Sequence, residues 1–67
     1  MESVVQWLEA NAEFDSEQNA YYDQGGYCDS TRFQIIGDKI NVYWSDEYGQ
    51  DSDRDLTIDE FKQEYMK

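Results

Sequence analysis

The chain has 67 residues, of which 16 are acidic, 5 are basic and none is histidine, so its formal net charge at pH 7 is −11. Hydrophobic residues make up 39% of the chain and aromatic residues 16%. A disordered acidic tail is poor in aromatic residues, so we expect residues 1–67 to form one folded domain with an acidic surface. The sign of the charge excludes a basic nucleic-acid binder, and no apolar run approaches the roughly 20 residues of a membrane-spanning helix.

The cysteine content and the N-terminus indicate a compartment. Cys28 is the single cysteine, so an internal disulfide framework is impossible and a reducing environment is expected. The chain opens with Met1-Glu2 and has no apolar stretch of the kind that signal peptides contain. We therefore expect a cytoplasmic protein without membrane contact, in the host cytoplasm if the source is viral.

Two helices are predicted in the N-terminal third. The first covers residues 3–12, where Ser3 and Gln6 have the spacing of a capping box and apolar residues recur at helical spacing, at Val4, Val5, Leu8 and Ala12. The second is shorter and runs from Asp15-Ser16 to Tyr22, ended by Gly25-Gly26.

The middle of the chain predicts a β-hairpin. Residues 32–36 and 39–44 are rich in β-branched and aromatic side chains and flank Gly37-Asp38, a pair that suits a two-residue turn. Closing the turn there pairs Ile36 with Lys39 and places one apolar set on a single face, namely Phe33, Ile35, Ile40, Val42 and Trp44. The opposite face then carries Arg32, Gln34, Lys39, Asn41 and Tyr43.

The remaining segments predict a small α+β fold. A third strand is conceivable over residues 27–31, and residues 45–55 are expected to form an acidic loop. Thr57 and Glu60 have capping-box spacing and open a predicted helix that runs to about Met66. We expect the helices to pack on one face of an antiparallel hairpin or three-stranded sheet.

The acidic residues fall into two segments. Residues 1–31 carry a net charge of −7 and residues 46–60 carry −6, whereas the hairpin between them is nearly neutral. The most ordered pattern is Asp51-x-Asp53-x-Asp55, because alternate side chains of an extended chain point the same way, ~6.6–6.8 Å apart. Phosphates of one DNA strand advance ~3.4 Å along the axis and follow a longer winding path, so such carboxylates could occupy lysine and arginine sites built for phosphates.

The candidate partner-binding residues follow from this charge pattern. The first group is Asp46, Glu47, Asp51, Asp53, Asp55 and Asp59, and the second is Glu9, Glu13, Asp15 and Glu17. Tyr48 joins them, because tyrosine offers both contact area and a hydroxyl at protein interfaces. The alternative is that the acidic surface serves solubility alone. Small domains are already well solubilised by net charges of magnitude about 2–8, and the charge of −11 exceeds that range.

The same segment partly resembles a calcium-binding loop. Asp51, Asp53 and Asp55 resemble the start of an EF-hand loop. Counted from Asp51, however, position 6 is Leu56 rather than glycine and position 12 is Lys62 rather than glutamate. The sequence therefore predicts no dedicated metal site, and weak calcium binding by this segment is kept as an alternative.

Enzymatic activity is not expected. The chain lacks histidine, a nucleophile-elbow motif, a phosphate-binding glycine loop and a zinc-ligand pattern. A chain of this length also has little room for a water-excluding pocket. We expect no cofactor and no catalytic residues.

The binding hypothesis that remains is nucleic-acid mimicry. Fixed carboxylates would occupy the basic groove of a DNA- or RNA-handling enzyme and exclude its substrate. In size, charge and lack of catalytic groups the chain resembles the small acidic proteins by which bacteriophages inhibit host restriction, CRISPR or repair enzymes, although no motif carries this resemblance. The expected partner is a basic nucleic-acid-binding protein, with no direct contact to nucleic acid and a monomer or small homo-oligomer as the binding form. The alternative is an acidic adaptor that binds a basic protein outside its nucleic-acid site.

Overall fold

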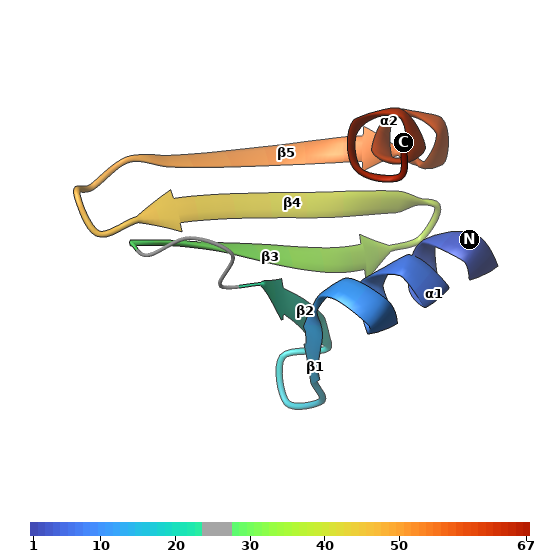
Figure 1. Cartoon of the computed structure of the whole chain (residues 1–67), viewed down its shortest axis with the longest axis horizontal. Helices are drawn as coiled ribbons and strands as arrows, with labels where there is room; N and C mark the ends of the chain where they lie inside the picture. The colour runs from blue at the N-terminus through green and yellow to red at the C-terminus, as the bar shows by residue number, and fades with distance from the viewer. Residues whose placement is uncertain (24–27) are drawn as a thin grey trace.

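The computed structural model describes residues 1–23 and 28–67. Its elements in chain order are α1 (Glu2–Asn11), β1 (Glu13–Asp15), β2 (Ala20–Asp23), β3 (Asp29–Ile36), β4 (Lys39–Asp46), β5 (Asp51–Thr57) and α2 (Ile58–Tyr65). The strands form one antiparallel sheet in the order β1-β2-β3-β4-β5 (Figure 1), so each strand pairs with its neighbours in the chain. The predicted α+β class is confirmed, but the prediction of two or three strands is wrong because the sheet has five.

The central hairpin forms in the predicted register. Ile36 pairs with Lys39, and the pairing continues without a bulge to Asp29 and Asp46. Gly37 opens the turn with a φ of +64°, a conformation that glycine adopts without the steric cost of a Cβ atom. The strand considered over residues 27–31 is not separate: its residues from Asp29 onward extend β3, and Tyr27 lies outside the described residues.

The second predicted helix is wrong, because residues 13–23 form the β1–β2 hairpin instead. The Asp15 carboxylate accepts hydrogen bonds from the backbone N–H groups of Glu17 (3.0 Å) and Gln18 (3.4 Å), and Asn19 has a φ of +53°. Such local bonds give the backbone a turn as an alternative to a helix. The expected stop at Gly25-Gly26 lies outside the described residues.

The predicted acidic loop over residues 45–55 is also wrong for most of its length. Only residues 47–50 connect the strands, and β5 pairs with β4 from Asp51 opposite Ser45 to Thr57 opposite Lys39. Leu56 is the one buried side chain of β5. The strand is therefore held by its backbone ladder and by polar pairs, which an apolar alternation pattern does not reveal.

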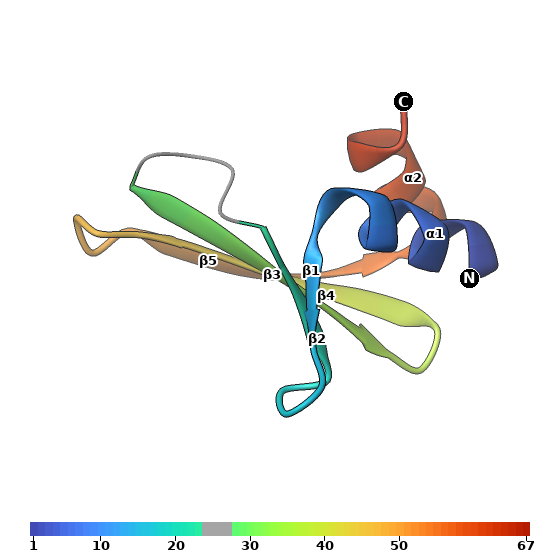
Figure 2. The ribbon, with the colours of Figure 1, turned by 60° about the horizontal axis from the view of Figure 1, so that its bottom comes forward.

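Both helices lie on the same side of the sheet, toward the end that carries the β3–β4 turn (Figures 1 and 2). The capping box of α2 is confirmed: Thr57 Oγ1 accepts from the Glu60 N–H at 3.1 Å, and Glu60 Oε1 accepts from the Thr57 N–H at 2.9 Å. The capping box predicted at Ser3 is wrong, because α1 already begins at Glu2 with Met1 as a cap that forms no side-chain bond.

The core fills the space between the helices and the covered face of the sheet. Its fully or nearly fully buried members come from both helices and from β3, β4 and β5, namely Val4, Leu8, Phe33, Ile40, Val42, Leu56 and Phe61. The rings of Phe33 and Phe61 meet edge to face with centroids 5.9 Å apart, and Trp7 packs against both. Within the described part of the chain, no helix is both long and apolar enough to cross a lipid bilayer.

Candidate functional site

The side of the sheet opposite the helices, here called the open face, carries mostly polar side chains. Residues that pair directly across an antiparallel sheet point to the same face. One row across the open face therefore runs Asp53, Tyr43, Arg32, Tyr22 and Glu13, from β5 to β1. This row places an acidic residue at each edge of the sheet and tyrosine and arginine residues between them.

Asp51, Asp53 and Asp55 lie along the open face of β5 and are here called the aspartate row. They pair with Ser45, Tyr43 and Asn41 of β4, and all residues from Asp51 to Asp55 are exposed. Strand geometry fixes the side chains at intervals of ~6.6–6.8 Å along one direction. The predicted alignment of the three carboxylates is thus present, on a regular strand rather than in a loop.

Asn41 holds two members of the aspartate row in place. Its side chain is 9% exposed, and its Nδ2 atom donates to Asp53 Oδ1 at 2.6 Å and to Asp55 Oδ1 at 3.0 Å. The Asn41 Oδ1 atom accepts a hydrogen bond of 3.2 Å from Arg32 Nη2. Because an arginine can only donate, this bond sets which end of the Asn41 amide faces the aspartates.

Tyr43 contacts Asp51, the third residue of the aspartate row. Its hydroxyl donates to Asp51 Oδ2 at 3.3 Å, and its ring packs under the guanidinium of Arg32 at 5.3 Å from the ring centroid. Arg32 thus lies over Tyr43 and bonds Asn41, so one basic side chain supports both residues that contact the row. Its Nε atom is buried and has no hydrogen-bond partner among the described residues.

The aspartate row keeps hydrogen-bonding capacity that the described residues do not use. Each of its carboxylates uses one oxygen in these bonds, and the other oxygen has no side-chain or backbone hydrogen-bond donor within the described residues. None of the five basic side chains forms an ion pair with the row in that same part of the chain. A carboxylate accepts up to about four hydrogen bonds, so each one can still bind an arginine or lysine.

The predicted residues near the β4–β5 turn have different roles. The Asp46 carboxylate accepts from the backbone N–H groups of Tyr48 and Gln50, both at 2.9 Å, and so shapes the turn. Glu47 is exposed in the same turn. Tyr48 is 75% exposed, and its hydroxyl lies 3.6 Å from the Cys28 sulfur. The turn therefore presents Glu47 and Tyr48 next to the Asp51 end of the row.

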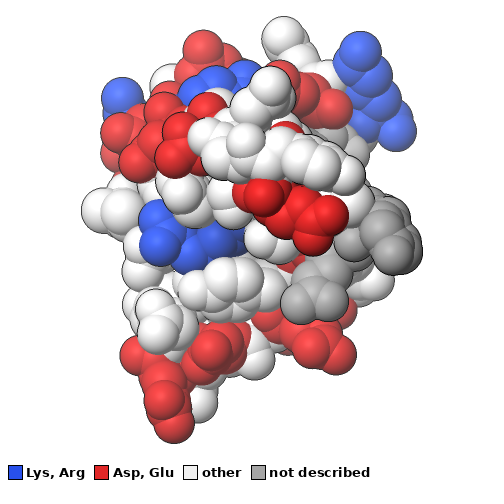
Figure 3. Space-filling view, turned by 90° about the vertical axis from the view of Figure 1, so that its left-hand side faces the viewer, with Lys and Arg blue, Asp and Glu red and all other residues white. Residues whose placement is uncertain are grey.

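The remaining predicted residues are not brought to the aspartate row. Glu13 and Asp15 belong to β1, at the opposite edge of the sheet and four strand spacings, or ~19 Å, from β5. Glu17 lies in the β1–β2 turn, while Glu9 and Asp59 are exposed on the helices, which cover the other face. Figure 3, seen from the β4–β5 turn, accordingly shows acidic side chains in several groups with basic ones between them.

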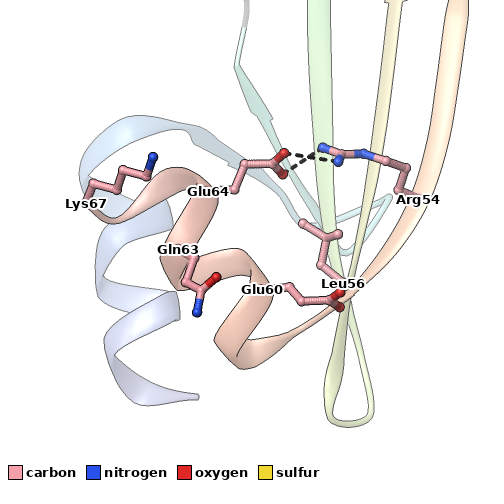
Figure 4. A pocket seen from close by; sticks show the side chains of 6 residues that line it. All are labelled: Arg54, Leu56, Glu60, Gln63, Glu64 and Lys67. Carbon is pink, nitrogen blue, oxygen red and sulfur yellow. Dashed lines mark hydrogen bonds and ion pairs between the residues drawn. The ribbon is translucent and has the colours of Figure 1, made fainter.

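A shallow hollow lies between β5 and α2, on the helix side of the aspartate row (Figure 4). It is lined by Arg54, Leu56, Glu60, Gln63, Glu64 and Lys67. Arg54 forms a two-pronged ion pair with Glu64, at 2.7 and 3.1 Å, and this hydrogen-bonded pairing raises the pKa of Arg54 above its ordinary value. Both side chains are almost half exposed, so the pair adds little stability but fixes the charge next to the hollow.

The aspartate row is not arranged as a cation cage. The space between the Asp53 and Asp55 carboxylates faces the Asn41 NH₂ group, a hydrogen-bond donor to both, where a calcium site needs oxygen ligands. Among the residues that the structure describes, no three or more histidine, cysteine or acidic side chains are grouped to hold a metal ion. The Asp51–Asp55 segment is a paired strand rather than the loop in which weak calcium binding was expected; calcium binding itself stays a prediction.

Comparison with known families, with curated proteins and with solved structures found no match to this chain. The site must therefore be interpreted from its own geometry. Sequence reasoning found the aspartate row but missed its supports, Asn41, Tyr43 and Arg32. The signal was available in part: these three residues lie on the polar face of the predicted hairpin, and a strand at 51–57 would have placed the row beside them.

Proposed function

We propose that this protein is a nucleic-acid-mimicking inhibitor that occupies the basic groove of a DNA- or RNA-handling enzyme. The observation that carries the proposal is the aspartate row, three exposed carboxylates aligned on one face of β5 and held by Asn41 and Tyr43. Lysine and arginine side chains that normally bind successive phosphates would bind these carboxylates instead. Competition for the groove is the mechanism of inhibition.

Pre-organisation supports this proposal over a purely solubilising role. A solvated acidic surface needs no fixed positions, and side chains that order only on binding lose entropy at that step. Here the buried amide of Asn41 and the hydroxyl of Tyr43 already fix one oxygen of each carboxylate. The three exposed residues are aligned on one face of the strand, and each keeps a second oxygen without a donor among the described residues, an arrangement that recognition requires and solubility does not.

The electrostatic field of the whole protein also favours a basic partner. A net charge of −11 on 67 residues attracts basic grooves and speeds their encounter, and salt reduces this attraction. The same charge repels nucleic acid itself, so a direct complex with DNA or RNA is not proposed. Glu47 and Tyr48, exposed in the turn beside Asp51, are proposed to extend the contact at one end of the row.

The test is capture of the partner followed by competition. The tagged protein is immobilised, host lysate is applied at low and then moderate salt, and the eluted proteins are identified by mass spectrometry. Excess DNA or RNA is then added to the purified complex. The proposal expects one nucleic-acid enzyme to be retained, and expects nucleic acid to displace the inhibitor from it.

Two outcomes contradict the proposal. If the partner stays bound under excess DNA and RNA, the contact lies outside the nucleic-acid site, and the protein is an acidic adaptor. If only a scatter of abundant basic proteins elutes and salt removes them all equally, the surface is non-specific. A matched control is the Glu2→Gln, Glu9→Gln, Glu17→Gln variant, which removes three charges far from the aspartate row and should still be displaced by nucleic acid.

A further inference from the structure

Within the described residues, the outer edge of β5 pairs with no other strand. The direction of its backbone N–H and C=O groups follows from the sheet register. Ile36 and Lys39 flank the two-residue turn and exchange backbone hydrogen bonds, so the N–H and C=O of Lys39 face β3. Along a strand this direction alternates, so the groups of Val42 face β5 and those of its partner Arg54 face back toward β4. The backbone N–H and C=O groups of Asp51, Asp53 and Asp55 therefore face away from β4.

A second observation agrees with this assignment. Asn41 Nδ2 donates to the Arg54 carbonyl oxygen at 3.3 Å, which places that carbonyl on the β4 side. Beyond strand pairing, none of the backbone hydrogen bonds between described residues involves Asp51–Asp55. The three aspartates thus present outward backbone donors and acceptors, and each keeps one carboxylate oxygen without a hydrogen-bond donor among the described residues.

This edge lacks the usual protection against strand addition except for its charge. Natural edge strands are blunted by shortness, proline, a bulge or charged side chains. β5 has seven residues, no proline and a continuous register with β4, but three like charges on one face. A second copy of β5 laid alongside would place aspartates next to aspartates, which is destabilising. A strand with lysine or arginine in those positions would instead be attracted.

We propose that β5 accepts an extended basic segment of the partner as a sixth strand, an inference that rests on the proposed function only for the basic character of the partner. Backbone bonds to Asp51, Asp53 and Asp55 supply affinity, as in other cases of β-strand addition. Residues of the segment on the open face lie beside the aspartate row and are basic. Residues on the other face lie beside Ser52, Arg54 and the hollow of Figure 4 and are uncharged.

The requirement for uncharged residues on that face follows from Arg54. Its guanidinium is already paired with Glu64 at the mouth of the hollow. The charges that line the hollow, Arg54 and Lys67 against Glu60 and Glu64, sum to zero, so a basic side chain of the partner meets a like charge in Arg54 and gains no net attraction there. The occupant is therefore a segment in which basic and uncharged residues alternate. A run of consecutive basic residues fits the edge less well at the same total charge.

The experiment uses a synthetic peptide, acetyl-Lys-Thr-Lys-Val-Lys-Thr-Lys-amide, and the full-length protein. Two further peptides carry backbone N-methyl groups, one on the lysines and one on the threonines and valine. An added strand turns only one of these two sets of N–H groups toward β5. We expect one methylated peptide to lose affinity on the order of tenfold or more and the other to bind nearly as the parent does. For an antiparallel strand the lysine-methylated peptide is the one that loses.

A pair of protein variants provides an independent test. Asp53→Ala and Asp53→Pro both remove the carboxylate, but only proline also removes the outward N–H. Because that N–H makes no bond to β4, both variants should fold, and the proline variant should bind the parent peptide on the order of tenfold more weakly than the alanine variant. Amide hydrogen exchange on the wild-type protein should slow at Asp51, Asp53 and Asp55 when peptide is added, with little change at Ser52 and Arg54.

The outcomes separate this inference from the proposed function. Equal affinity of both methylated peptides, no slowing of exchange, or no binding of the parent peptide overturns strand addition and leaves competition with nucleic acid to be judged on the captured enzyme. Conversely, peptide pairing as expected with a partner that nucleic acid does not displace upholds strand addition and overturns the nucleic-acid mimic.

Discussion

The two faces of β4 perform different tasks with alternating residues of one strand. Ile40 and Val42 point toward the helices and are buried in the core, whereas Asn41 and Tyr43 point to the open face and bond the aspartate row. The covered face gains its stability from apolar burial, which tolerates no charge. The open face gains little stability from its polar contacts but sets the positions of three charges. Alternating residues of one strand therefore divide between the core and the support of the aspartate row, and the proposed recognition can be altered without touching the core.

The largest expected effect is a loss of folding stability from a substitution in the core on the covered face. Phe61 is fully buried and contacts Trp7, Phe33 and Tyr65, so Phe61→Ala should lower the free energy of unfolding by about 3–5 kcal/mol. A domain this small has little stability to lose, and the variant should be largely unfolded near 37 °C. Circular dichroism in urea measures the change. A loss below about 1 kcal/mol would show that the aromatic cluster is not the core.

The next effect concerns the support of the aspartate row at constant net charge. Asn41→Leu removes the donor to Asp53 and Asp55 and the acceptor for Arg32. We expect the affinity for the captured partner to fall on the order of tenfold, while the net charge stays at −11. Gln34→Leu is the control, because Gln34 lies on the same face but, among the described residues, its side chain bonds backbone carbonyls of the β1–β2 turn and not the aspartate row. Equal affinity of the Asn41→Leu variant and the wild type would mean that net charge alone determines binding.

A smaller effect tests the junction between β5 and α2. Thr57→Ala removes the cap that accepts from the Glu60 N–H and should cost about 1 kcal/mol of stability. Because the aspartate row is supported by β4 rather than by α2, partner affinity should change less than about twofold. Urea denaturation measures the change in the free energy of unfolding, and binding to the captured enzyme measures the change in affinity. A large loss of affinity would couple the helix to the row, against the separation described above.

The smallest effect is a pH dependence. Hydrogen bonds from the Thr57 backbone and side chain hold the pKa of the Glu60 carboxyl below its ordinary 4.5. Its stabilisation is therefore complete above pH 4.5 and is lost as the pH falls through the lowered pKa of the folded state. Glu60→Gln does not titrate, so the wild type should lose stability relative to this variant on acidification below pH 4.5. A constant difference between their urea midpoints from pH 6 to pH 3 would contradict this.

The elements that the sequence predicted correctly are those with an apolar pattern or a local capping signal. The β3–β4 register followed from Phe33, Ile35, Ile40 and Val42, and the start of α2 followed from Thr57. β5 could not be predicted in this way, because Leu56 is its one buried residue and its other partners are polar side chains on β4. The β1–β2 hairpin was missed because the turn depends on Asp15 and Asn19, residues that cap helices as readily as they close turns.

The same distinction applies to the candidate site: features with a local sequence pattern could be predicted, and features that depend on tertiary pairing could not. The spacing of Asp51, Asp53 and Asp55 was visible as an alternation, and their common direction is present in the structure. The pairing of β1 with β2 then places Glu13 and Asp15 at the far edge of the sheet, which no local pattern indicates. The use of Asp46 to shape its own turn was likewise hidden, because an acidic residue in a loop has the same composition whether it binds a partner or the backbone.

The most direct measurement compares two variants of equal net charge. Asp51→Asn, Asp53→Asn, Asp55→Asn removes the aspartate row, and Glu2→Gln, Glu9→Gln, Glu17→Gln removes three acids elsewhere, so both carry −8 instead of −11. Affinity for the captured nucleic-acid enzyme is measured by calorimetry at several salt concentrations. We expect a loss on the order of 100-fold and a flatter salt dependence for the first variant, and a loss of only a few-fold for the second. Equal losses for the two variants would contradict a shaped row of carboxylates and leave unspecific charge as the basis of binding.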